Sequence, residues 1–165
     1  MDSTEQLVLT AQLGATFAGL LSIFLIFARR EGRFSPADSL RVSSILLSSF
    51  FVVFFALLPL VLQLYGLNAG TIWRVAGALA CLAAVPSGIN VARRQLALRA
   101  EERAKVGRLH SSISWGLFAV AAVLMMIDAL GLDAQSGSAF YVTALGCALG
   151  IATSNFITIA FQRLL

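Results

Sequence analysis

Residues 42–65 read VSSILLSSFFVVFFALLPLVLQLY, an apolar stretch without a charged side chain. A helix needs about 20 mostly apolar residues to cross the hydrocarbon core of a bilayer, so this stretch predicts a transmembrane helix. It is preceded by Ser35-Pro36-Ala37-Asp38, the residue types of an N-cap, a proline at the first helical position and a carboxylate in the first turn. We therefore expect the helix to begin near Pro36, before it enters lipid.

The composition of the whole chain also indicates a membrane protein. Apolar residues make up 59% of the 165 residues and charged residues 12%, whereas soluble proteins have roughly 45–50% and about 25%. A soluble fold of this size cannot hide so much apolar surface, so lipid must cover part of it. The length suits one compact domain, a single helical bundle.

Four further stretches are long and apolar enough to cross a bilayer. Four helices with one stretch lying in the interface are the alternative, and Ile113–Leu132 is the weakest span because Asp128 lies near its end. Removing any one span would place an arginine-rich loop on the outer side of the membrane, so we favour five transmembrane helices. The predicted helices are 7–28, 42–65, 72–92, 113–132 and 139–161.

The charge distribution predicts the orientation. Eleven of the 12 basic residues fall in loop 29–41, loop 93–112 and the C-terminus, and only Arg74 falls on the other side. Basic loops stay in the cytoplasm, so we expect an outer N-terminus and an inner C-terminus. Acidic residues precede the first apolar run and Arg29-Arg30 follow it, which indicates a retained anchor rather than a signal peptide. We expect a multi-pass protein of a bacterial-type inner (plasma) membrane.

A weak internal repeat divides the chain after its first helix. Gly66-Leu67-Asn68-Ala69 resembles Gly131-Leu132-Asp133-Ala134, and Ala78–Cys81 resembles Ala144–Cys147 at nearly the same offset. One interpretation is a leading helix followed by two duplicated helical hairpins. The other is chance similarity between apolar segments, and the pattern does not separate the two.

Small residues lie at helical spacing in several predicted helices. Such residues let helix backbones approach closely in lipid. We interpret these faces as packing within the bundle, with self-association or a pore lining as the sharper alternative. The candidate packing face comprises Gly14, Gly19, Gly77, Gly146 and Gly150.

Two prolines interrupt predicted helices and free backbone carbonyls. Pro59 frees the carbonyl of Phe55, and Pro86 frees that of Leu82. Polar residues follow Pro86 and recur at similar depth in the last helix, where they can either line a small hydrated pocket or hydrogen-bond to neighbouring helices. The candidate polar pocket comprises Pro86, Ser87, Asn90, Thr153, Ser154 and Asn155.

Charged residues elsewhere give two more candidate sites. Arg74 and Asp128 fall at similar depth and form a candidate outer ion pair, unless Arg74 reaches the headgroups beside Trp73. The basic inner loop attracts anionic lipid headgroups at the cytoplasmic face, and docking of a cytoplasmic partner is the alternative. The candidate headgroup or partner contacts are Arg93, Arg94, Arg99, Arg103, Lys105 and Arg108.

The sequence contains no pattern typical of an enzyme. It has one histidine, two cysteines within apolar stretches and scattered carboxylates, so we predict no catalytic residue, no metal site, no cofactor and no nucleic-acid partner. We expect a non-catalytic membrane protein that acts through helix packing in a homo-oligomer or a larger membrane complex. The alternative is a small oligomeric ion or solute channel whose path is lined by the third and fifth helices.

Overall fold

The computed structural model describes residues 3–30, 35–102, 107–132 and 139–164, and all of its regular elements in these ranges are helices. Each helix contains a stretch long and apolar enough to cross a membrane, which confirms the predicted class of multi-pass helical protein. The helices extend past most predicted ends, because hydropathy marks only the part in lipid. They are α1 (Ser3–Arg30), α2 (Pro36–Leu64), α3 (Ala69–Ala97), α5 (Arg108–Leu130) and α6 (Ala139–Leu164).

The start of α2 confirms the predicted cap. The backbone N–H of Asp38 donates to the Ser35 hydroxyl at 3.2 Å, and the Ser35 N–H donates to the Asp38 carboxylate at 3.3 Å. Pro36 occupies the first turn, where its missing N–H costs nothing. This reciprocal capping satisfies two orphan donors and fixes where the chain turns into the bundle.

Two glycines end α2 and α5 at the same end of the bundle. Gly66 has φ of 70° and Gly131 has φ of 65°, in the left-handed region that glycine adopts without strain. Asn68 then caps α3 by accepting a hydrogen bond from the Thr71 N–H at 2.8 Å. The connection from α2 to α3 is therefore tight, and the two helices run in opposite directions.

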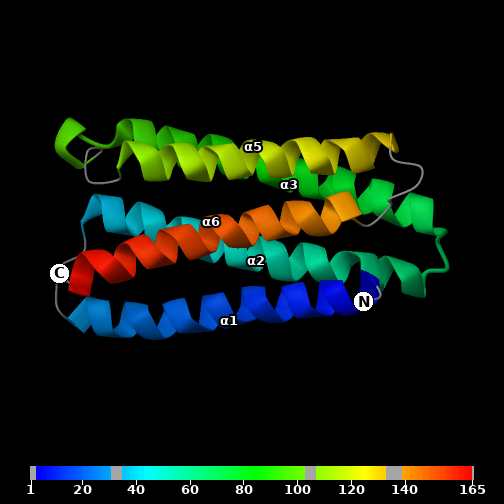
Figure 1. Cartoon of the computed structure of the whole chain (residues 1–165), viewed down its shortest axis with the longest axis horizontal. Coiled ribbons are helices and arrows are strands. Elements are labelled where there is room, and N and C mark those ends of the chain that lie inside the picture. Colours follow the sequence, from blue (N-terminus) through cyan, green and yellow to red (C-terminus); the bar gives the residue numbers. More distant parts are fainter. Residues whose placement is uncertain (1–2, 31–34, 103–106, 133–138, 165) are drawn as a thin grey trace.

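Four helices, α2, α3, α5 and α6, form a ring in which each packs against two neighbours, in the order α2–α3–α5–α6 (Figure 1). Helix α1 packs outside this ring, against α2 and α6. Helices α3 and α6 occupy opposite corners. We call the end where α2 and α5 begin the basic end, because Arg41, Arg93 and Arg94 lie there, and the opposite end the Tyr141 end.

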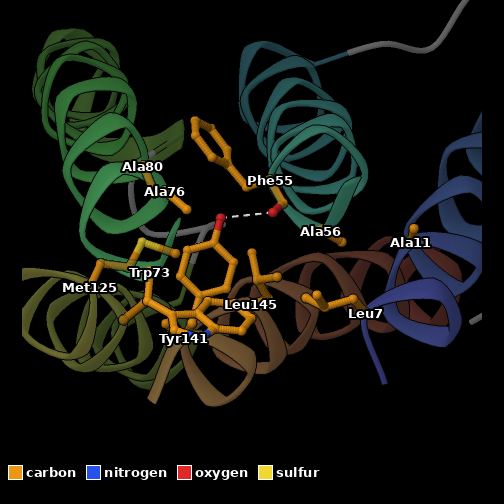
Figure 2. Packing of buried hydrophobic residues seen from close by; sticks show 12 residues of the cluster. Leu7, Ala11, Phe55, Ala56, Trp73, Ala76, Ala80, Met125, Tyr141 and Leu145 are labelled. Atoms are coloured by element: carbon orange, nitrogen blue, oxygen red, sulfur yellow. Dashed lines mark hydrogen bonds between the residues drawn. The ribbon is translucent and has the colours of Figure 1, made fainter. Parts of the chain in front are cut away.

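All five helices share one apolar core towards the Tyr141 end (Figure 2). Tyr141 of α6 is fully buried, and its hydroxyl donates to the backbone carbonyl of Phe55 in α2 at 2.7 Å. Pro59 has no N–H to offer that carbonyl, so the tyrosine supplies the missing donor. The cluster comprises Leu7, Ala11, Phe55, Ala56, Trp73, Ala76, Ala80, Ala121, Met125, Tyr141, Ala144 and Leu145.

A second core cluster lies towards the basic end and joins only three helices. Its buried members come from α1, α2 and α6, and none comes from α3 or α5. The two halves of the bundle are therefore packed differently: one core unites all helices at the Tyr141 end, whereas α3 and α5 lie outside the basic-end core. The cluster comprises Leu21, Val42, Ile45, Ala152 and Ile159.

Candidate ligand-binding cavity

A cavity of about 130 Å³ occupies the inside of the four-helix ring, on the side towards the basic end. Its apolar wall includes Phe51, Ala84, Phe118, Ala121, Met125 and Ala148. Its polar wall includes Arg41, Gln95, His110, Ser111, Ser114 and Asn155. The polar residues come from the basic end of each helix, so the cavity is amphiphilic along its length.

His110, near the start of α5, connects α5 to α6. Its Nε2 lies 3.1 Å from the Asn155 side-chain oxygen, and its Nδ1 lies 3.1 Å from the Ser154 hydroxyl. Because the Asn155 amide nitrogen donates to the Ile151 carbonyl at 2.8 Å, the oxygen faces the imidazole and His110 Nε2 donates to it. Asn155 is 5% exposed, so this bond lies inside the bundle.

Gln95 of α3 connects α3 to α5 at the same depth. Its amide nitrogen donates to the Ser111 hydroxyl at 2.7 Å, and its amide oxygen accepts from the Trp115 indole N–H at 3.0 Å. Both polar atoms of this side chain are thereby satisfied by one neighbouring helix. The basic end of α5 is thus held by side-chain hydrogen bonds to α3 and to α6.

Ser114 places a buried hydroxyl beside the cavity without a hydrogen-bond partner in the described part of the chain. Hydroxyls in membrane helices ordinarily bond to the carbonyl four residues earlier. Ser44 does so at 3.0 Å and Ser87 at 2.7 Å, and both of these also line the cavity. Ser114 makes no such bond among the described residues, and neither does the buried Ser49 hydroxyl of α2. A buried polar atom without a partner is costly unless something fills that role.

Arg41 is the charged group of the cavity wall and is only 2% exposed. It lies one turn after Asp38, with an N–O distance of 3.8 Å between the two side chains. The capping box fixes Asp38, and the helical spacing then directs Arg41 into the ring.

The cavity brings together part of the predicted polar pocket. Ser87 of α3 and Asn155 of α6 line it, and Ser154 contacts it through His110. Thr153 donates to the Leu149 carbonyl, whereas Pro86 and Asn90 are exposed on the outer surface of α3.

Sequence reasoning did not single out Arg41, Gln95 or His110 as pocket residues. The signal for His110 was its spacing, one turn before Ser114 on the same helix face.

The glycines of the predicted packing face have different environments. A Cβ on Gly77 would lie 2.9 Å from the Met125 carbonyl oxygen, and one on Gly14 would lie 3.1 Å from the Ser49 carbonyl oxygen. These two glycines allow backbone contact between helices. Gly150 faces a Leu117 methyl group at 3.3 Å. Gly19 and Gly146 have open space in front of them within the described chain.

The predicted charged sites lie at the two ends of the bundle. The Arg74 guanidinium lies against Gly131, at the C-terminal end of α5, where the helix dipole favours a cation. Asp128 is 3% exposed, and its Cβ adjoins Gly77. At the basic end, Arg93, Arg94 and Arg99 are exposed. Arg103, Lys105 and the Arg108 side chain lie outside the part that the structure describes.

The described residues contain no group of three or more His, Cys, Asp or Glu side chains that could hold a metal ion. The arrangement instead offers a shaped volume with a cation, an imidazole, an amide and a hydroxyl at one end and apolar side chains at the other. No protein-family model, curated protein or solved structure matches this chain.

Proposed function

We propose that the protein is a non-catalytic membrane protein that holds a small amphiphilic molecule in the cavity of its four-helix ring. The observation that carries this proposal is the cavity of about 130 Å³ with polar and apolar walls. An apolar cavity of about 150 Å³ holds a benzene molecule, so this volume accommodates a segment of about six carbon atoms. The Ser114 hydroxyl supports a polar occupant at one end.

A matched pair of alanines in α5 tests this proposal. Ala122 lines the cavity, whereas Ala119 is exposed on the same helix. The protein is purified, extracted with organic solvent and examined by mass spectrometry for molecules that copurify. We expect wild type and Ala119→Phe to carry the same molecule and Ala122→Phe to lose most of it. Equal amounts in all three proteins, or no copurified molecule in any of them, would refute ligand binding in the cavity.

We also propose that the basic end faces the cytoplasm, with the N-terminus outside. The support is the gathering of Arg41, Arg93, Arg94 and Arg99 at one end of the described bundle, with Arg74 at the other. The test attaches a membrane-impermeant maleimide to single cysteines in a background without Cys81 and Cys147. Leu67→Cys should react in intact cells, and Ala100→Cys should react only after lysis. The opposite pattern would reverse the orientation.

The two hairpins α2–α3 and α5–α6 are proposed to be copies of one unit. Gly66 and Gly131 support this, because they occupy equivalent places in the repeat and both have positive φ. The cavity then lies between two related hairpins, with α1 outside them.

A permeation path is the second candidate function. Ser87 and Asn155 favour it, because they line the cavity from α3 and α6, at opposite corners of the ring. Such a path would have to open the core around Tyr141. Flux of ions and small solutes in liposomes tests it, with Asn155→Leu as the cavity variant and Asn90→Leu, at an exposed asparagine, as its control. Flux that is equally affected, or unaffected, in both variants would exclude the cavity as the path.

A further inference from the structure

Helix α1 buries one side against α2 and α6, and residues on its opposite side are exposed. The buried side carries Leu7, Ala11, Gly14 and Leu21. On the exposed side, residues at alternating intervals of four and three form one row, which is the spacing along which two membrane helices pack against each other. We call this row the α1 seam; it comprises Val8, Gln12, Ala15, Gly19 and Ser22.

Gln12 places an amide of the α1 seam deep in the membrane. Its depth follows from Gly14, where a Cβ would lie 3.1 Å from the Ser49 carbonyl oxygen and 3.1 Å from a Val53 methyl group. Helices α1 and α2 run in opposite directions (Figure 1), so Gln12 lies about 3 Å further towards the Tyr141 end than Gly14. That level is the middle of the charge-free stretch 42–65, about 15 Å from each of its ends.

An amide at this depth needs a hydrogen-bonding partner. The Gln12 side chain is exposed and makes no hydrogen bond to any residue that the structure describes. Lipid tails offer neither donors nor acceptors, so an amide that faces them is costly. Thr16, one turn later, shows the usual solution, since its hydroxyl donates to the backbone carbonyl of Gln12 at 2.8 Å. The Gln12 amide therefore indicates that another protein helix covers the α1 seam.

A second copy of α1 supplies a partner at the right depth. Copies of one membrane protein insert in the same direction, so a two-fold axis in the bilayer places both Gln12 side chains at the same level. A primary amide has donors and an acceptor, and each Gln12 can donate an N–H to the oxygen of the other. Ala15 and Gly19 follow on the seam, and small residues let helix backbones approach closely. A Cβ on Gly19 would meet nothing within 4 Å in the described chain, so this place is open to a neighbour.

We infer that the protein forms a homodimer in the membrane, in which two α1 helices pack along the α1 seam and their Gln12 amides exchange hydrogen bonds. A single polar residue in such a seam also fixes the register of the two helices. This inference goes beyond the proposed ligand binding and does not depend on it, because no described residue of α1 lines the cavity.

Energy transfer between labelled copies measures the dimer. The label is attached to Ala100→Cys in a background without Cys81 and Cys147, and donor-labelled and acceptor-labelled copies are reconstituted together in phosphatidylcholine vesicles at decreasing ratios of protein to lipid. We expect more transfer than randomly placed monomers give. Gln12→Leu should raise the dissociation constant of the dimer about tenfold, the effect of losing two hydrogen bonds between membrane helices. Gln12→Asn should keep most of the affinity, and Gln63→Leu, at an exposed glutamine near the end of α2, should leave it unchanged.

A pair of glycines tests the close packing separately from the amide. Gly19→Leu adds a side chain to the α1 seam and should raise the dissociation constant at least tenfold. Gly146→Leu adds the same side chain to α6, where the described chain also leaves open space, and should not change it. Gln12 and Gly19 are exposed, so their variants should keep the circular dichroism spectrum of the wild-type protein.

Cysteine cross-linking locates the contact on α1. Ala15 lies on the α1 seam, whereas Leu13 is 45% exposed on an adjoining side of the same helix. In the background without Cys81 and Cys147, Ala15→Cys should form a disulfide-linked dimer on mild oxidation in vesicles, because the two residues then face each other across the axis. Leu13→Cys should not, because a disulfide requires Cα atoms within about 7 Å.

Four results would overturn the inference. They are energy transfer no greater than that of randomly placed monomers, an effect of Gln12→Leu no larger than that of Gln63→Leu, an effect of Gly19→Leu no larger than that of Gly146→Leu, and equal cross-linking of Ala15→Cys and Leu13→Cys. The copurification measurement with Ala119→Phe and Ala122→Phe is independent of all four.

Discussion

Tyr141→Phe removes a single hydroxyl from the middle of the five-helix core. That hydroxyl donates to the Phe55 carbonyl at 2.7 Å, and the side chain is fully buried. Phe55 cannot recover the bond from its own helix, because residue 59 is a proline. The variant therefore keeps the ring and its packing against Trp73, at a centroid distance of 5.6 Å, and loses only the donor.

The cost of Tyr141→Phe depends on whether the Phe55 carbonyl finds another hydrogen-bond donor. Leaving a buried acceptor without a partner costs about 1–3 kcal/mol, whereas side-chain hydrogen bonds in membrane bundles average about 0.6 kcal/mol and reach about 1.7 kcal/mol. We place the cost of losing the bond to the Phe55 carbonyl at the upper end of that range, because Pro59 removes the alternative donor. We expect Tyr141→Phe to lower the free energy of unfolding by about 1.5 kcal/mol, roughly a tenfold change in the folding equilibrium.

Replacing Pro59 by alanine tests the reason for the effect. Pro59→Ala restores an N–H that can bond to the Phe55 carbonyl, so the carbonyl stays satisfied when the hydroxyl is removed. In the Pro59→Ala background, Tyr141→Phe should cost only about 0.5 kcal/mol, and the double-mutant cycle should give a coupling of about 1 kcal/mol. Tyr65, which is 76% exposed, supplies the control variant Tyr65→Phe, with no expected change.

Unfolding is measured by titrating detergent-solubilised protein with sodium dodecyl sulfate and recording circular dichroism and tryptophan fluorescence. Trp73 reports on the same core. A cost for Tyr141→Phe that is equal in both backgrounds would refute the link between Pro59 and Tyr141. No cost in the wild-type background would show that the bond contributes nothing to stability.

Three further predictions concern the other helix contacts. His110→Ala breaks the connection from α5 to α6 and should lower the free energy of unfolding by about 1–2 kcal/mol in the same titration; an unchanged midpoint would contradict a structural role for this network. Gly77→Leu places a side chain against the backbone of α5 and should destabilise the monomer by about 3 kcal/mol or more. Gly146→Leu has open space in front of it and should leave monomer stability within about 0.5 kcal/mol, so a lower particle mass in this variant alone would identify an interface between copies.

The features that could be predicted from the sequence are those set by local chemistry. The cap at Ser35 and Asp38 depends on residues three positions apart, and the structure forms it as expected. The freed carbonyl of Phe55 also follows from Pro59 alone. Its partner does not, because Tyr141 lies 86 residues away and reaches it only through the packing of α6 on α2.

The candidate pocket was predictable only in part for a related reason. Ser87 and Asn90 are less than one turn apart on α3, and the sequence does not say which of them faces inwards, because α3 has apolar residues on all sides. The structure turns Ser87 to the cavity and Asn90 outwards. The cavity itself lies between four helices, and its shape depends on contacts between segments that are distant in the sequence.

The unequal packing of the two halves implies a gradient of local stability along the membrane normal. Backbone amides open with free energies that depend on how much buried apolar contact surrounds them. Residues 73–80 of α3 contribute to the shared core, whereas residues 87–95 of the same helix border the cavity. Deuterium should therefore replace amide protons sooner in residues 87–95 than in residues 73–80. The Tyr141 end would then stay closed while the other half of the bundle opens locally.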